Sequence, residues 1–266
     1  FARMGWHIIC TGRDPERCAD AEEEINAVAA PGARIDFVRG DFTEMREVKR
    51  VAEEIAELTD RIHVLVNNAG GVRDAYYRTS EGLEATFAAN HLAPFLLTRA
   101  LLPQLEKAAA ETPAGTVRVI AVSSSAHLVC EGMNWDDLMM AQNFAANAAY
   151  CQAKLANLLF TRELDRRLSD KGIVAQAMHP GRVGSNFASH GDDAMQAYMA
   201  ANECVPPESP ARTIVWLATA PDLGLDGGRY FHDLAELDPA PQAKDDTAAA
   251  RLWQESESIL ESLGQA

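Results

Sequence analysis

Residues 62–71 read Ile62-His63-Val64-Leu65-Val66-Asn67-Asn68-Ala69-Gly70-Gly71. Nearly every position of 62–66 is apolar, which is the pattern of a strand buried on both faces of a parallel sheet. Asn and Gly follow directly and tolerate the backbone angles of a tight turn. Ligands of such sheets bind beyond the carboxyl ends of the strands. The stretch therefore predicts a central strand, followed by either an ordinary turn or one wall of a ligand site.

Strand-like runs alternate with helical stretches on both sides of this segment. The strands are expected at 6–10, 34–38, 117–122, 173–178 and 228–231, and the helices at 15–29, 43–58, 147–168, 210–217, from 247 onward and after Ser80. Strands separated by helices of this length form β-α-β units. We expect an α/β fold with a doubly wound parallel sheet, in a single domain over residues 1–266.

Composition excludes several classes of function. The 266 residues include 39 Asp and Glu but only 24 Lys and Arg, and the net charge is −15. Nucleic-acid binding and docking on an anionic membrane both need basic surfaces. No apolar run approaches the length of a membrane span, which is about 18 residues. The five cysteines are odd in number and lack C-x-x-C spacing, so we expect no structural metal site and a reducing, cytoplasmic environment.

Tyr150 and Lys154 are four residues apart and therefore share one face of the helix expected at 147–168. An ammonium beside a phenol favours the phenolate and lowers the pKa of the phenol. Such a tyrosine exchanges protons near neutral pH. By itself the pair is equally a packed ring beside a solvated amine.

Polar residues also follow two other strands. Ser123-Ser124-Ser125 follow the strand at 117–122, and His179-Pro180-Gly181-Arg182-Val183 follow the strand at 173–178. Each segment alone is an ordinary cap or turn. Together with Asn67–Gly71 they place polar groups at successive strand ends, where a ligand binds.

In this order the motifs resemble those of the short-chain dehydrogenase/reductases, over nearly the whole chain. The branch that the chain looks most like is that of the retinol dehydrogenases and the WW-domain oxidoreductase. The resemblance implies a Rossmann-like sheet. It is carried by Asn67-Asn68-Ala69-Gly70, Asn90-His91-Leu92, Ser123-Ser124-Ser125-Ala126-His127, Tyr150-x-x-x-Lys154-Leu155-Ala156-Asn157, His179-Pro180-Gly181 and Gly228-Arg229-Tyr230-Phe231.

The resemblance implies catalytic roles for four residues. Tyr150 would be the general acid in carbonyl reduction and the general base in alcohol oxidation. Lys154 would lower the pKa of Tyr150 and hold the nicotinamide ribose. Ser124 would hydrogen-bond the substrate oxygen, with Ser123 and Ser125 as alternatives one position away.

Asn90 would hold a water molecule in a proton relay to Lys154. Pro94 lies in the helical pattern 87–101 and has no N–H to bond the carbonyl of Asn90, four residues earlier. We expect a kink that leaves this carbonyl free for the relay water. The alternative is a helix break with ordinary solvent at the carbonyl.

Arg13 follows the strand at 6–10 in the order Thr11-Gly12-Arg13-Asp14. An arginine suits the 2′-phosphate of NADP, whereas an acidic residue accepts the ribose hydroxyls of NAD. NADP(H) is therefore favoured over NAD(H), with Asp14 read as a helix cap. The expected cofactor-binding residues are Arg13, Asp41, Phe42, Asn68, Ala69, Gly70, Tyr150, Lys154, Pro180, Gly181, Val183 and Ser185.

One departure from the family stands at the start of the chain. The family opens with a strand and a glycine-rich loop whose amides receive the pyrophosphate. Thr11-Gly12 is not that motif, and residues 1–5 look like the tail of a first helix. We expect the first strand and the glycine-rich loop to be missing from this chain.

Residues 184–207 form a long irregular stretch after a strand, which is typical of a substrate lid. Phe187, Met195, Tyr198 and Met199 make it apolar, as a dimer contact or ordinary lid packing also would. The opposite wall is expected from Met139, Met140 and Phe144. His127 and His179 are expected to be structural, because the family assigns acid–base work to tyrosine.

These features predict an NADP-dependent oxidoreductase for a small apolar aldehyde, ketone or alcohol, without a metal. A non-catalytic cofactor-binding scaffold is the alternative of another class, since a fold does not fix a function. A sugar-nucleotide epimerase or dehydratase is disfavoured because few residues follow Pro180. The resemblance also allows a homodimer or a homotetramer.

Overall fold

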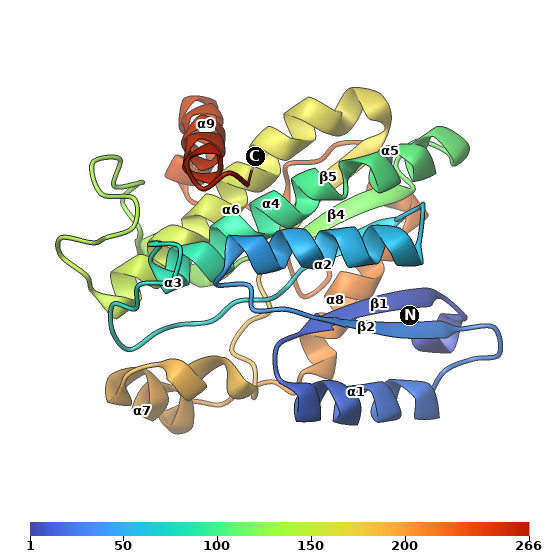
Figure 1. Cartoon of the computed structure of the whole chain (residues 1–266), viewed down its shortest axis with the longest axis horizontal. Helices are drawn as coiled ribbons and strands as arrows, with labels where there is room; N and C mark the ends of the chain where they lie inside the picture. Colours follow the sequence, from blue (N-terminus) through green and yellow to red (C-terminus); the bar gives the residue numbers. More distant parts are fainter. Residues whose placement is uncertain (266) are drawn as a thin grey trace.

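The computed structural model describes residues 1–265, without the side chains of Asn186, Ala188 and Asp222. Its strands are β1 (His7–Gly12), β2 (Arg34–Arg39), β3 (Val64–Asn67), β4 (Val117–Val122), β5 (Ile173–Met178), β6 (Tyr230–His232) and β7 (Ala235–Leu237). Its α-helices are α1 (Pro15–Ala27), α2 (Met45–Leu58), α3 (Ala85–Phe87), α4 (Ala93–Ala100), α5 (Leu102–Glu111), α6 (Ala146–Leu168), α7 (Asp193–Ala201), α8 (Glu208–Thr219) and α9 (Asp246–Ser262) (Figure 1).

Strands β3, β4, β5 and β6 form a parallel sheet in that order, and β7 adds an antiparallel edge. Helices α5 and α6 contact β4 and β5 from one face, and α8 contacts the same strands and β6 from the other (Figure 1). Strand β1 pairs in parallel with β2, and α1 packs on this pair. The α/β fold with helices on both faces is the predicted one.

Strands β1 and β3 are not hydrogen-bonded to one another, and within residues 1–265 each has a strand partner on one edge only. Residues of both strands line one cavity, among them Ile8, Ile9 and Val64–Val66. Val64–Val66 are therefore only half-buried, and the prediction that this strand is buried on both faces is wrong. Full burial holds for β4 and β5, at all six positions of each strand. The absence of a first strand and a glycine-rich loop stays a prediction.

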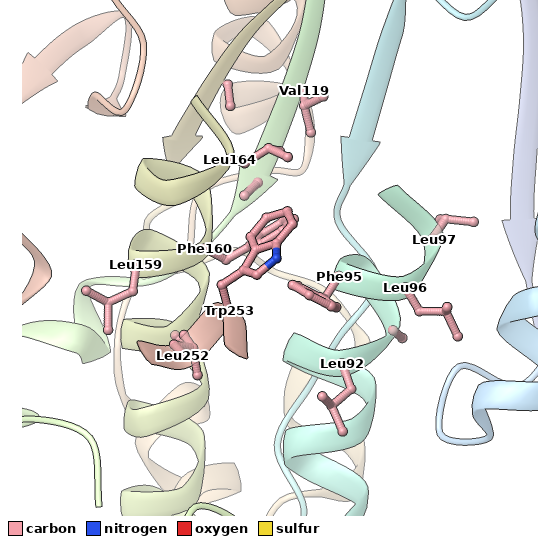
Figure 2. Close-up of a cluster of buried hydrophobic side chains, with 14 of the residues drawn as sticks. Leu92, Phe95, Leu96, Leu97, Val119, Leu159, Phe160, Leu164, Leu252 and Trp253 are labelled. Carbon is pink, nitrogen blue, oxygen red and sulfur yellow. The ribbon is translucent and has the colours of Figure 1, made fainter. Parts of the chain in front are cut away.

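The core lies between the sheet and helices α2, α4, α6 and α9. Figure 2 shows its aromatic centre, where Trp253 of α9, Phe95 of α4 and Phe160 of α6 pack against one another. The ring of Trp253 is 4.8 Å from that of Phe95 and 6.0 Å from that of Phe160, centroid to centroid. This packing fixes α6, which carries two of the predicted catalytic residues.

Three local predictions are corrected. The helical region after Ser80 is divided into α3, a π-helical turn at Ala88–Leu92, α4 and α5. The helix predicted from residue 43 begins at Met45, and the carboxylate of Glu81 caps it by accepting from the amides of Met45 and Arg46. The stretch 184–207 contains α7, which the sequence pattern did not indicate.

Candidate active site

A cavity of 1420 Å³ opens between β1 and β3 and extends along the carboxyl ends of the parallel strands. Its volume exceeds the range of ordinary ligand pockets, which is about 300–1,000 Å³. Residues from many separate segments of the chain reach it. Those predicted from the sequence are Asn68, Gly70, Ser124, Tyr150, Lys154, Pro180, Gly181, Val183 and Ser185.

Tyr150 and Lys154 lie in the first three turns of α6 and face this cavity. Both are buried, with 7% and 5% of their surface exposed. Nζ of Lys154 is 5.6 Å from the centroid of the Tyr150 ring and donates to the carbonyl of Val122, at 3.1 Å. The helical spacing thus brings phenol and ammonium together, as predicted.

Burial governs the protonation of both groups. It raises the pKa of Tyr150 to about 12, although a hydrogen bond with the Ser124 side chain lowers this pKa in part. It lowers the pKa of Lys154 to about 8. The pKa of Tyr150 therefore moves in the direction opposite to the one predicted from its neighbour alone, because desolvation of the phenolate outweighs the hydrogen bond with Ser124 that opposes it.

The three serines after β4 are placed differently. Ser123 is buried and donates its hydroxyl to the carbonyl of Lys154, at 2.7 Å. Ser125 is exposed. Ser124 caps the 3₁₀ turn Ser125–Val129 by accepting from the amide of Ala126, and its side chain interacts with Tyr150. Among the three, Ser124 combines a cavity position with contact to Tyr150.

Asn90 lies behind the cavity wall, in the π-helical turn, and is 1% exposed. Its amide nitrogen donates to the carbonyls of Gly71, at 2.9 Å, and Thr86, at 2.8 Å. Its amide oxygen accepts from the amide of Gly71, at 3.2 Å. The side chain therefore fastens the turn after β3 to the helix. A π-helical turn thus precedes Pro94, and the kink with a free Asn90 carbonyl stays a prediction.

Arg13 and Asp41 lie together at a second, smaller cavity of 550 Å³. The guanidinium is 3.4 Å from the carboxylate, and about half of the Arg13 side chain is exposed. Phe42 packs against the core and, like Ala69, is not among the residues that line either cavity. Of the residues predicted to contact the adenine half of the cofactor, Arg13 and Asp41 are thus in reach of a ligand.

The apolar residues of the predicted lid face the cavity. Phe187, Met195, Tyr198 and Met199 all line it. The Phe187 ring is 5.2 Å from that of Tyr150, centroid to centroid.

The opposite wall is not where it was predicted. Met139 packs against the core and Phe144 against Tyr76, and neither these two nor Met140 lines the cavity. This segment turns away because Gln152 ties it to α6, through the amide of Asn134 and the carbonyl of Leu138.

Several lining residues were missed from the sequence. Arg17, Val129, Asn147 and Cys151 all face the cavity. Asn147 lies three residues before Tyr150 in the predicted helix, so the helical spacing held a usable signal for it. Val129 gave none, because its position depends on the 3₁₀ turn.

Two absences concern residues 1–265 alone. Within that range, no group of three or more His, Cys, Asp or Glu side chains is arranged to hold a metal ion. No helix in it combines the length and the apolar character that crossing a membrane requires.

Comparisons with known proteins agree on the family to which the chain is similar. Residues 1–195 match the family model described as short chain dehydrogenase. Human retinol dehydrogenase 13 is 35% identical over 98% of this chain and 78% of its own length. Mouse retinol dehydrogenase 14 is 34% identical over 97% of this chain and 79% of its own length.

Solved structures agree with this. An uncharacterised protein from Mycobacterium paratuberculosis superposes with a TM-score of 0.71 at 30% identity, over 98% of this chain and 86% of that one. The NADP complex of RhlG from Pseudomonas aeruginosa superposes with a TM-score of 0.63 at 25% identity, over 85% and 84%. The chain therefore belongs to the short-chain dehydrogenase/reductase family and is an oxidoreductase that acts on CH–OH and carbonyl groups.

Proposed function

We propose that this oxidoreductase uses NADP(H) and interconverts an apolar aldehyde or ketone with the corresponding alcohol. The observation that carries the proposal is the meeting of Ser124, Tyr150 and Lys154 on the wall of one cavity whose lid is apolar. A hydroxyl, a phenol and an ammonium at one point can bind a carbonyl oxygen and give it a proton.

In this proposal Tyr150 is the general acid of reduction and the general base of oxidation. The nicotinamide, when bound, supplies or accepts the hydride. In reduction the Tyr150 hydroxyl gives its proton to the substrate oxygen and becomes a phenolate; in oxidation the Tyr150 phenolate takes the proton from the alcohol. Ser124 orients that oxygen by a hydrogen bond, and Lys154, whose Nζ has one protein acceptor, keeps donors for the cofactor ribose and for a proton relay.

Asn90 contributes to the relay through its backbone rather than its amide. The amide is already committed to Gly71 and Thr86. The carbonyl of Asn90 lies in the π turn before Pro94, which has no N–H to offer it. We assign this carbonyl to a water that passes the proton between Lys154 and solvent.

The residues present fit a nicotinamide dinucleotide. Asn68, Gly70, Pro180, Gly181, Val183 and Ser185 would hold its nicotinamide half along the strand ends. Arg13, half exposed with one carboxylate neighbour, retains donors for a 2′-phosphate, which favours NADP over NAD. The likeness to RhlG, solved with NADP, supports the same choice.

The substrate is expected to be apolar because Phe187, Met195 and Met199 line the cavity. The ring of Phe187 also packs against that of Tyr150. The similarity to proteins named retinol dehydrogenases supports a long, unsaturated example of this class. A cytoplasmic location and a homodimer or homotetramer stay predictions.

Turnover is the test. We expect NADPH to be oxidised faster than NADH with a panel of apolar aldehydes that includes retinal. Tyr150→Phe should abolish turnover while NADPH still binds, measured by the change in its fluorescence. Binding without turnover across the panel would favour the non-catalytic scaffold, and unchanged turnover in Tyr150→Phe would refute the acid–base assignment.

A further inference from the structure

His127 lies three residues after Ser124 and its side chain is completely buried. The sequence marked it only as a structural histidine. Both ring nitrogens have backbone partners: Nδ1 is 2.7 Å from the carbonyl of Ser124 and Nε2 is 3.2 Å from the amide of Ala240. A carbonyl can only accept and an amide N–H can only donate. Nδ1 therefore carries the proton and Nε2 is the acceptor.

This arrangement excludes His127 as an acid or a base. Neither nitrogen is free, and protonation of Nε2 would break the bond from Ala240. Burial lowers the pKa of the ring, more than the bond to Ser124 raises it. The residue is also not among those that line the cavity. Its contribution must pass through the groups that it binds.

The group that it binds is the backbone of the serine beside Tyr150. The carbonyl of Ser124 accepts twice, from Nδ1 and from the backbone amide of His127, at 3.3 Å. The Ser124 hydroxyl accepts from the amide of Ala126, at 3.1 Å, which leaves the hydroxyl hydrogen for Tyr150 or a substrate oxygen. The imidazole thus fixes the peptide plane from which this hydroxyl extends.

The other end of the imidazole is anchored in the C-terminal part of the chain. Ala240 lies between β7 and α9, and Gln242 of the same segment donates to the carbonyl of Cys130. Tyr230 of β6 packs edge-on against the imidazole, with 5.0 Å between centroids. Elements on both sides of the ring therefore hold it in one orientation.

We propose that His127 is the positioning residue for Ser124, and that it aims the serine hydroxyl at the reacting oxygen by holding the Ser124 carbonyl against the segment 240–242. The proposal rests on the function proposed above for Ser124. It assigns His127 neither a proton-transfer step nor a contact with the cofactor.

Two substitutions separate the two hydrogen bonds. His127→Asn places an amide N–H near the position of Nδ1, so the bond to Ser124 can persist while the bond from Ala240 is lost. His127→Gln places its polar end near the position of Nε2, so the bond from Ala240 can persist while the one to Ser124 is lost. We expect His127→Gln to lower kcat by about 10- to 100-fold, as a misplaced catalytic group does. His127→Asn should keep kcat within about 3-fold.

The measurements are kcat, the KM for NADPH, the pH profile and the melting temperature of each variant. A positioning role predicts that His127→Gln changes kcat but not the KM for NADPH or the pH profile. Ser256→Ala is the matched control, because it removes the hydrogen bond of another buried histidine, His91, away from the cavity. It should lower the melting temperature and leave kcat unchanged.

A double-mutant cycle with Ser124→Ala completes the test. If His127 acts through Ser124, His127→Gln lowers kcat no further in the Ser124→Ala background. Additive losses, or equal kcat values in His127→Gln and His127→Asn, would overturn the positioning role. Full activity of Ser124→Ala would instead overturn the proposed function of Ser124, and the two failures are thereby distinguished. If His127→Gln does not fold, His127→Phe, which lacks both bonds but keeps a ring, takes its place in the cycle.

Discussion

A Cβ atom at Gly70 would lie 2.4 Å from Oδ1 of Asn90, closer than real Cβ atoms approach any neighbour, and 3.5 Å from Nζ of Lys154. The turn after β3 therefore fits against Asn90 only because residue 70 has no side chain. Through Gly71, the same Asn90 amide fastens this turn to the helix behind it.

Gly70→Ala is expected to displace either the turn or the Asn90 amide. We expect a loss of about 1–3 kcal/mol in the free energy of unfolding, as overpacking costs. The same shift should lower kcat/KM by about 100-fold, because Lys154 and the turn Gly70–Gly71, which line the cavity, would move with it. Steady-state kinetics and urea unfolding measure both quantities.

Gly132→Ala is the control for that experiment. A Cβ there meets no atom within 4 Å, so stability and activity should stay at the level of the unsubstituted protein. Wild-type kinetics in Gly70→Ala would show that the fit between Gly70 and Asn90 is dispensable.

Lys154→Met tests the cost of burying an ammonium. The pKa of Lys154 is lowered to about 8 in the folded protein, below its ordinary value of 10.5. The unfolded chain therefore binds more protons between pH 8 and 10.5, and stability rises with pH across this window. Below pH 8 the full cost is present, so Lys154→Met should be about 1–3 kcal/mol more stable at pH 7 and inactive. Urea unfolding at pH 7 and pH 10 checks this, and an equal gain at both pH values would contradict it.

The sequence predicted best the positions of the two central strands, β4 and β5, which are buried on both faces. The predicted bounds of β4 and β5 agree with the structure, because every position of these strands is apolar or packed. The proximity of Tyr150 and Lys154 followed from helical spacing alone. The direction of the Tyr150 pKa did not, since spacing fixes a neighbour but says nothing of how much water is excluded.

What could not be predicted depends on contacts between distant segments. Glu81 supplies the cap of α2 from 36 residues away in the sequence. Phe42, which follows the strand at 34–38, is predicted to bind the cofactor, yet its side chain packs against the core. The bond from Ala240 to His127 joins residues 113 positions apart, and no local pattern indicates it.

Phe187→Ala tests the contact between the proposed lid and Tyr150, the proposed acid–base residue. The ring lies 5.2 Å from that of Tyr150, so its loss should open the cavity to water beside the reacting oxygen. We expect kcat/KM for an apolar aldehyde to fall by about 10- to 100-fold, and Phe187→Leu to recover most of it, since an apolar side chain again fills the space. If both variants lose activity equally, a role for the aromatic ring itself would replace simple exclusion of water.

Trp253→Ala tests the aromatic centre of the core drawn in Figure 2. The indole contacts Phe95 and Phe160, and the guanidinium of Arg167 lies 4.2 Å from its ring centroid. We expect a loss of about 3–5 kcal/mol in the free energy of unfolding, with kcat unchanged per folded molecule. Glu255→Ala, at an exposed ion pair on the same helix, should cost no more than about 0.5 kcal/mol.

Acid stability depends on His91, which is fully buried. Ser256 donates to the carbonyl of Leu252 and so accepts from Nε2 of His91, while Nδ1 has no hydrogen-bond partner. Burial lowers the pKa of His91 to about 3, from 6.5.

The unfolded chain binds the proton first, so the free energy of unfolding falls as the pH falls from 6.5 toward 3. His91→Gln keeps a donor near Ser256 but does not titrate, so its unfolding free energy should fall less between pH 7 and pH 4. Urea unfolding at each pH unit measures the slope. A wild-type slope in His91→Gln would place the acid sensitivity elsewhere.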